Sequence, residues 1–155
     1  MAGRIDERLN ELGITIPEPA APVANYVPAV RTGNLVFISG QVPTRDGQVE
    51  YVGKLGAGLG IEEGRAAARL CGLNILAHLK AACDGDLDRV RRCVKLNGYV
   101  NSAPDFKDQP KVINGVSDLM VEVFGDAGRH ARAAVGTAAL PLGVGVEVEA
   151  VFEIA

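Results

Sequence analysis

The final ten residues alternate strictly between apolar and mostly charged positions. Glutamates fill three of the alternate positions, Glu147, Glu149 and Glu153. The intervening positions are apolar: Val146, Val148, Ala150, Phe152 and Ile154. Successive side chains of a strand point to opposite faces, so this segment predicts a strand with one face in a core. Such a strand needs partner strands beside it and a second layer over its apolar face, which limits the fold to a layered domain.

Three other segments have the spacing of helices. Apolar residues recur at helical intervals in each, and glycines follow their ends. The predicted helices cover Arg4–Leu12, about Ile61–Cys83, and the stretch from Asp108 to Gly125. Period-two or continuously apolar runs predict strands at Tyr26–Arg31, Leu35–Ile38, Gln48–Val52, Val90–Val100 and Arg132–Ala139.

This order of elements predicts an α+β fold, in which a mixed β-sheet carries two main helices on one face. A short N-terminal helix is added to it. Three prolines between residues 17 and 22 favour an extended connection. We therefore expect residues 1–24 to form a helix and a proline-rich connection, and residues 25–155 to form a single domain.

Composition excludes several classes of protein. The 155 residues include 16 Lys and Arg against 19 Asp and Glu, a net charge of −3, so no strongly basic footprint for nucleic acid is present. No apolar run approaches the roughly 20 residues that span a bilayer, and the first residues lack a secretory signal. The three cysteines have no CxxC spacing, which indicates reduced thiols rather than a zinc site. The sequence predicts a cytoplasmic protein without a membrane segment.

Isolated candidate residues do not define a site. The glycines between residues 53 and 60 lack the spacing of a nucleotide-binding loop. His78 lies mid-helix, where a satisfied or partly exposed imidazole is the ordinary interpretation. A Ser39–His130 nucleophilic pair is a formal alternative only. The basic residues from Arg89 to Lys95 are typical of a solvated strand, although RNA could touch them there.

Several stretches together carry more information. Tyr26 precedes the segment Leu35-Val-Phe-Ile-Ser-Gly-Gln-Val-Pro43, Asn114 lies on the last helix, and His130-Ala-Arg132, Leu140-Pro141 and Val146-Glu-Val-Glu-Ala150 follow. From Asn25 to Ile154 this pattern resembles the RidA/YjgF family of reactive-intermediate deaminases, also called L-PSP endoribonucleases. The resemblance implies a chorismate-mutase-like subunit that assembles as a homotrimer with clefts between subunits.

The resemblance also implies an activity, the hydrolysis of 2-imino or enamino acids to 2-keto acids and ammonia, with no metal and no other cofactor. Arg132 matches the arginine that binds the substrate carboxylate, and Glu147 matches the glutamate that activates water. The positions that line the family's cleft are Tyr26, Ser39, Gly40 and Asn114. Many members have a cysteine where this chain has Ala134, a position that can still contribute a backbone N–H.

The chemistry of these residue types supports such roles. A guanidinium fork binds a carboxylate through two parallel hydrogen bonds, which lysine cannot reproduce. Fixing that end of a 2-imino acid orients its C=N carbon toward a water. A nearby carboxylate can take a proton from this water and later return one to the departing ammonia.

The last two strands bear on where a site can form. If they make a tight hairpin near Leu142, Arg132 lies opposite Phe152 and Glu147 lies opposite Thr137. The two side chains would then be about 17 Å apart along the ladder and on opposite faces. This arrangement predicts a site shared between subunits rather than one within a chain.

Two other functions stay open. A trimer could bind small keto acids in the same cleft without turnover. Cleavage of single-stranded RNA is a weaker alternative, because the chain is acidic, has no tryptophan and has only 5% aromatic residues for base stacking.

Overall fold

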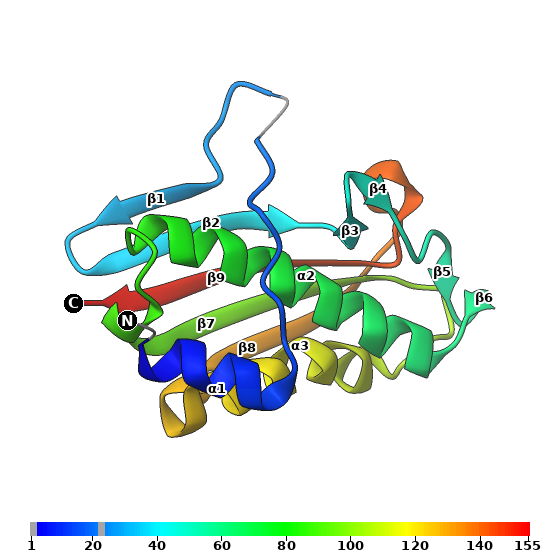
Figure 1. The fold of residues 1–155 in the computed structure, drawn as a ribbon. Helices are drawn as coiled ribbons and strands as arrows, with labels where there is room; N and C mark the ends of the chain where they lie inside the picture. Colours follow the sequence, from blue (N-terminus) through cyan, green and yellow to red (C-terminus); the bar gives the residue numbers. More distant parts are fainter. Residues whose placement is uncertain (1–2, 22–23) are drawn as a thin grey trace.

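A computed structural model describes residues 3–21 and 24–155. Its main feature is a five-stranded sheet (Figure 1), with its strands in the order β1-β2-β9-β7-β8. The strands are β1 (Ala29–Thr32), β2 (Leu35–Gln41), β7 (Val90–Asn101), β8 (Ala131–Thr137) and β9 (Val146–Ile154). β7 and β8 are parallel and the other neighbours are antiparallel, so the sheet is mixed. The predicted fold class is confirmed.

Two long helices cover the same face of this sheet (Figure 1), as the sequence predicts. They are α2 (Ile61–Ala82) and α3 (Gln109–Phe124). At the start of α2, the Glu63 carboxylate accepts a hydrogen bond from the Gly60 N–H at 3.1 Å. Pro110 stands in the first turn of α3, where its missing N–H is not needed, and Gly125 with φ of 62° ends that helix.

The close approach of α2 and α3 depends on a glycine. Gly115 of α3 is buried, and a Cβ built on it would overlap the carbonyl oxygen of Arg65 in α2. The two backbones can meet because α3 has no side chain at this point. Apolar residues fill the space between the helices and the sheet on either side of this point, among them Leu76, Leu119 and Phe152.

The N-terminal helix α1 (Arg4–Leu12) has the bounds that the sequence predicts. Its residues Ile5 and Leu9 are buried and belong to the main core cluster. The Asp88 carboxylate accepts hydrogen bonds from the Arg4 and Ile5 N–H groups at 2.9 and 2.8 Å. The chain then crosses over α2 on its way to β1 (Figure 1).

The alternation in β9 has the consequence that the sequence predicts. Its even-numbered residues face α2 and α3 and are buried, and its odd-numbered residues lie on the other face. That second face is open, because no helix of the described chain covers it (Figure 1). Its exposed apolar side chains include Val30, Phe37 and Val135.

The predicted hairpin of the last two strands is wrong. β7 lies between β8 and β9, so Arg132 pairs with Leu96 of β7 rather than with Phe152. The reason is the crossover: β7, α3 and β8 form a strand–helix–strand unit, which places its two strands parallel. The chain then returns through the short helix η3 (Pro141–Gly143) to the far side of β7.

Smaller elements complete the fold. β3 (Thr44–Arg45) and β4 (Gln48–Val49) form a hairpin, and β5 (Lys54–Leu55) pairs with β6 (Gly58–Leu59). Other 3-10 turns are η1 (Leu87–Arg89) and η2 (Gly125–Gly128). Cys71, Cys83 and Cys93 are buried and free, without disulfides. None of the helices described is both long and apolar enough to cross a membrane.

Candidate functional site

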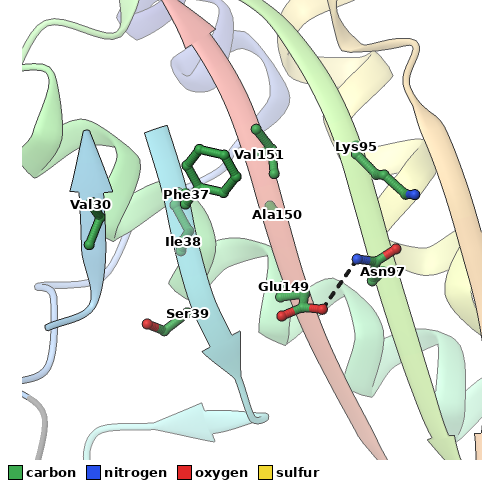
Figure 2. Close-up of a pocket in the computed structure, with 9 residues that line it drawn as sticks. All are labelled: Val30, Phe37, Ile38, Ser39, Lys95, Asn97, Glu149, Ala150 and Val151. Carbon is green, nitrogen blue, oxygen red and sulfur yellow. Dashed lines mark hydrogen bonds between the residues drawn. The ribbon is translucent and has the colours of Figure 1, made fainter. Parts of the chain in front are cut away.

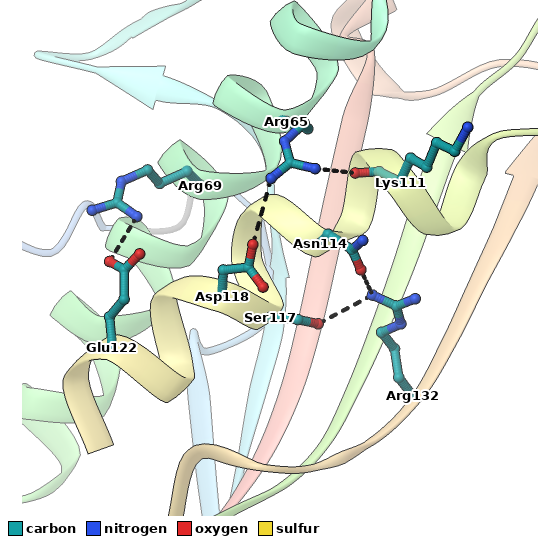
Figure 3. A network of polar contacts seen from close by, with 8 residues as sticks. All are labelled: Arg65, Arg69, Lys111, Asn114, Ser117, Asp118, Glu122 and Arg132. Atoms are coloured by element: carbon teal, nitrogen blue, oxygen red, sulfur yellow. Dashed lines mark hydrogen bonds and ion pairs between the residues drawn. The ribbon is translucent and has the colours of Figure 1, made fainter. Parts of the chain in front are cut away.

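Arg132 lies on β8 and points toward α3. Its Nη1 donates to Asn114 Oδ1 at 2.8 Å and to Ser117 Oγ at 3.2 Å (Figure 3). Its strand partner Leu96 is buried under the helices, which fixes the face from which the arginine emerges. Arg132 and Asn114, two of the predicted site residues, are therefore in direct contact.

Ser117 and His130 extend this group, which we call the arginine cluster (Asn114, Ser117, His130 and Arg132). His130 Nδ1 lies 2.6 Å from the Gly128 carbonyl oxygen, so this nitrogen must donate. His130 Nε2 lies 2.8 Å from the Ser117 hydroxyl oxygen, within hydrogen-bond distance. Sequence reasoning missed Ser117, although its place one turn after Asn114 on the same helix was the available signal.

The guanidinium of Arg132 keeps two nitrogens available. Nε and Nη2 have no hydrogen-bond partner in the described chain, and the group makes no ion pair there. The acids of α3 are used elsewhere: Asp118 pairs with Arg65 at 3.5 Å and Glu122 with Arg69 at 3.1 Å (Figure 3). Arg132 is thus held through one nitrogen by neutral oxygens and can bind a carboxylate through the other two.

Glu147 lies on the open face of β9, opposite Tyr99 of β7. A Cβ built on Gly40 would overlap its carboxylate, so the glutamate rests directly against the Gly40 backbone. Burial, and then the charge of Glu149, raise the pKa of Glu147. A raised pKa brings a carboxyl closer to the range in which it exchanges protons near neutral pH.

Glu149 is the better-satisfied carboxylate of the pair. The Tyr99 hydroxyl donates to its Oε1 at 2.5 Å and Asn97 Nδ2 donates at 3.2 Å. This hydrogen bond to Glu149, with burial, raises the pKa of Tyr99 to about 12. Two neighbouring carboxylates therefore have different surroundings, and Glu147 is the one without a hydrogen-bond donor in the described chain.

Two cavities adjoin this part of the sheet. A cavity of about 350 Å³ on the open face is lined by Ser39, Phe37, Lys95 and Glu149 among others (Figure 2). A second, of about 220 Å³, is lined by Tyr26, Gly40 and His78 among others. Ser39 donates to the Val27 carbonyl at 2.9 Å and does not pair with His130.

Ala134 follows Arg132 by two residues on the same face of β8 and packs against the core.

Five of the predicted site residues lie in two separate places of the structure. Arg132 and Asn114 are in the arginine cluster, and Tyr26, Gly40 and Glu147 are around the end of β2.

These two places are separate within one chain. Arg132 and Glu147 lie on opposite faces of the sheet, on strands that β7 separates. Strand spacing and rise put their backbones about 14 Å apart. The opposite faces agree with the sequence prediction, although the pairing from which it was derived is wrong. A small molecule cannot touch both side chains of the same chain.

Comparisons with known proteins place this arrangement in a family. Residues 6–153 match the family model described as "YjgF/chorismate mutase-like, putative endoribonuclease". The chain belongs to the RidA/YjgF family. Protein TCP17 of Trypanosoma cruzi is 51% identical over 154 residues, which are 99% of this chain and 96% of that protein. A 2-iminobutanoate/2-iminopropanoate deaminase of Dermatophagoides farinae is 27% identical and covers 91% of this chain and 94% of its own length.

A solved structure supports the same assignment. The crystal structure of the protein Atu1372 from Agrobacterium tumefaciens is 48% identical, with a TM-score of 0.91, and the match covers 97% of this chain and 92% of that one. For this RidA/YjgF member, the described residues contain no group of three His, Cys, Asp or Glu side chains placed to hold a metal ion. What the site residues offer is a guanidinium for an anion and a carboxyl group for proton transfer.

Proposed function

We propose that the protein hydrolyses 2-imino acids, or their enamine tautomers, to 2-keto acids and ammonia. The observation that carries the proposal is the state of Arg132. Its guanidinium is oriented by Asn114 and Ser117, has no ion pair in the described chain, and keeps Nε and Nη2 for a substrate carboxylate. The similarity to a named imine deaminase supports the same reaction.

In the proposed mechanism, Arg132 binds the carboxylate through two parallel hydrogen bonds and so fixes the adjacent C=N carbon. Glu147 accepts a proton from a water as the water oxygen bonds to that carbon. The resulting tetrahedral carbinolamine holds both nitrogen and oxygen on one carbon. Glu147 returns its proton to nitrogen, and the C–N bond then breaks to release ammonia. As it breaks, the hydroxyl proton passes to the Glu147 carboxylate, which leaves the keto group. The substrate imine plus water supply all atoms of the products.

We further propose that the site is completed in a homotrimer. Each chain carries an arginine cluster at its β8 edge and a Glu147 on the open face near β2. Because the two are about 14 Å apart on opposite faces, Arg132 of one subunit would face Glu147 of the next. Such head-to-tail contacts close into a ring when the rotation allows it.

The direct test generates 2-iminobutanoate with an amino-acid oxidase or dehydratase in the presence of semicarbazide, which traps the imine. Wild-type protein should reduce the trapped fraction. Arg132→Lys should lower the rate about 100-fold, since lysine keeps the charge but loses the paired hydrogen bonds. Arg129→Lys is the matched control, because Arg129 is exposed and, among the residues that the structure describes, its side chain pairs with Asp126 alone. Unchanged imine decay with folded wild-type protein would reject the proposal.

Mixing variants tests the shared site. Arg132→Ala and Glu147→Ala proteins should each be inactive, and co-refolding them should restore part of the activity through subunit boundaries that carry both intact residues. No recovery in mixed trimers would argue against a site between subunits.

Keto-acid binding without turnover is the competing function for the same residues. Saturable binding of 2-ketobutyrate by a protein that leaves imine decay unchanged would select it. Glu147→Gln would then keep its affinity, because only Arg132 touches the carboxylate.

The family description also names an endoribonuclease. Cleavage of single-stranded RNA that is lost when the basic residues from Arg89 to Lys95 are neutralised would support that activity.

A further inference from the structure

His78 is a buried polar side chain without a partner. It lies on α2, and only 5% of its surface is exposed. Neither ring nitrogen makes a hydrogen bond within the described chain. In that part of the chain, every side-chain nitrogen or oxygen that has no accessible surface does have a hydrogen-bond partner. The ring nitrogens must therefore reach open space, and the space beside this imidazole is the cavity of about 220 Å³. Buried polar groups in native proteins almost always have a partner, so an unpartnered imidazole at a cavity points to a ligand group.

The cavity adjoins the residues proposed to act on substrate. Gly40 lines it and also contacts the Glu147 carboxylate, so one residue separates the cavity from that carboxylate. Tyr26 forms another part of the wall. The chain segment that leads from α1 supplies the small side chains of Ala20 and Ala21.

The size of the cavity indicates which part of a ligand it takes. Sites for whole small molecules measure roughly 300–1,000 Å³. At about 220 Å³ this cavity fits a short side chain rather than a complete ligand. A small acid whose reacting carbon lies beside Glu147 would have its side chain near Gly40.

The chemistry of the wall indicates what kind of side chain fits. No Lys, Arg, Asp or Glu lines the cavity within the described chain, so it offers no countercharge to an acidic or basic group. Burial lowers the pKa of His78, which favours the neutral imidazole. A neutral imidazole has one donor and one acceptor, and both match a hydroxyl group.

On the basis of the proposed function, we infer that this cavity is the side-chain subsite, and that His78 selects imino and keto acids whose short side chain carries a neutral hydrogen-bonding group. His78 is here a specificity-determining residue: it contacts the side chain of the substrate and not the reacting carbon.

An isosteric pair of keto acids tests the subsite. 4-Hydroxy-2-oxobutanoate and 2-oxopentanoate differ by a hydroxyl in place of a methyl. Wild-type protein should bind the hydroxy acid about three- to tenfold more tightly, the usual value of one neutral hydrogen bond. His78→Leu should remove this preference. His78→Gln, which keeps a donor and an acceptor, should retain most of it.

The two histidines of the chain provide an independent readout. In a proton NMR titration, the hydroxy acid should shift the imidazole signals of both His78 and His130, whereas 2-oxopentanoate should shift mainly that of His130, which lies in the arginine cluster. A preference that survives in His78→Leu, or equal binding of both acids by wild type, overturns the subsite while leaving the proposed function intact. If neither acid binds and neither signal moves, the proposed function fails, and the subsite fails with it.

Discussion

At the scale of single residues, Gly40 and Glu147 depend on each other. The glutamate occupies the volume in which any other residue at position 40 would place its Cβ. This position lies where β2 has an irregular register against β9, between Ile38 and Gln41. The Glu147 carboxylate can therefore occupy this place because residue 40 is a glycine and has no side chain.

Gly40→Ala should separate activity from stability. The new methyl group meets the far end of a flexible side chain, so Glu147 can turn away and the free energy of unfolding should change by less than about 1 kcal/mol. The displaced carboxylate would no longer reach the attacking water, and kcat for imine hydrolysis should fall at least tenfold. Urea unfolding and the semicarbazide assay measure the two quantities. A variant as active as wild type would contradict the placement of Glu147.

The raised pKa of Glu147 predicts a particular dependence of stability on pH. Between the unfolded and folded pKa values the folded protein binds more protons, so stability is highest below the unfolded value and falls as the pH rises through the folded one. Glu147→Gln has no titrating carboxyl at this position, so it does not lose this stability as the pH rises. It should unfold at a higher temperature than wild type at pH 7, and the difference should vanish below about pH 4.

Glu153→Gln, on the same face of the same strand, is the control for this measurement. A difference between Glu147→Gln and wild type that stays constant from pH 4 to pH 8 would show that the change acts through packing and not through the charge.

Site residues differed in how far sequence could locate them. Arg132 and Glu147 stand in recognisable segments, and their opposite faces follow from strand parity. Ser117 stands one turn after Asn114, which marks it as a candidate, but its contact with Arg132 depends on how α3 lies over β8. The unpartnered state of His78 depends likewise on the path of the chain over α2, which no local pattern encodes.

At the scale of elements, α2 and α3 meet at Gly115. A Cβ there would overlap a backbone carbonyl, which cannot turn away as the end of a side chain can. The same substitution, glycine to alanine, should therefore have opposite consequences at positions 40 and 115.

Gly115→Ala should destabilise the fold by about 1–3 kcal/mol, the typical effect of overpacking a well-filled core. The separation of the helices would also shift Asn114, the partner of Arg132. Urea unfolding midpoints measure the effect, with Gly40→Ala as the comparison. Equal stability of the two variants would mean that the helix pair adjusts without cost.

Most elements could be predicted from the sequence, and their pairing could not. The bounds of α1 and the inward face of β9 follow from local periodicity. The pairing of β8 with β7 depends on α3 acting as a crossover between them. A short connection such as the one around Leu142 also occurs between strands that are not adjacent, so loop length alone does not determine a neighbour.

At the scale of the whole molecule, the sheet has one covered face and one open face. Val30, Phe37 and Val135 are each between 44% and 51% exposed on the open face. Val30 and Phe37 are paired neighbours on β1 and β2, whereas Val135 lies on β8 at the opposite edge. Adjacent exposed apolar groups such as the first two are typical of surfaces that bind another protein. Under the proposed function, this face would bury itself against other copies of the chain.

Phe37→Lys should therefore convert the proposed trimer to a monomer, because it places a charge in the middle of the contact. Sedimentation velocity measures the change in mass, and imine hydrolysis should be lost with it. Val52→Lys is the control, since Val52 is 56% exposed but lies outside the five-stranded sheet. A Phe37→Lys protein that sediments like wild type would show that the open face is not the contact.

All three cysteine side chains are closed off from solvent in the folded protein. Burial raises the pKa of Cys71, Cys83 and Cys93, and no part of these side chains is open to solvent. Only the thiolate reacts readily with alkylating agents, so labelling has to wait for the molecule to open. The rate at which iodoacetamide modifies the native protein would then report the rate of the unfolding that exposes the thiols. A protein built in this way would tolerate electrophiles and peroxides that modify an exposed cysteine.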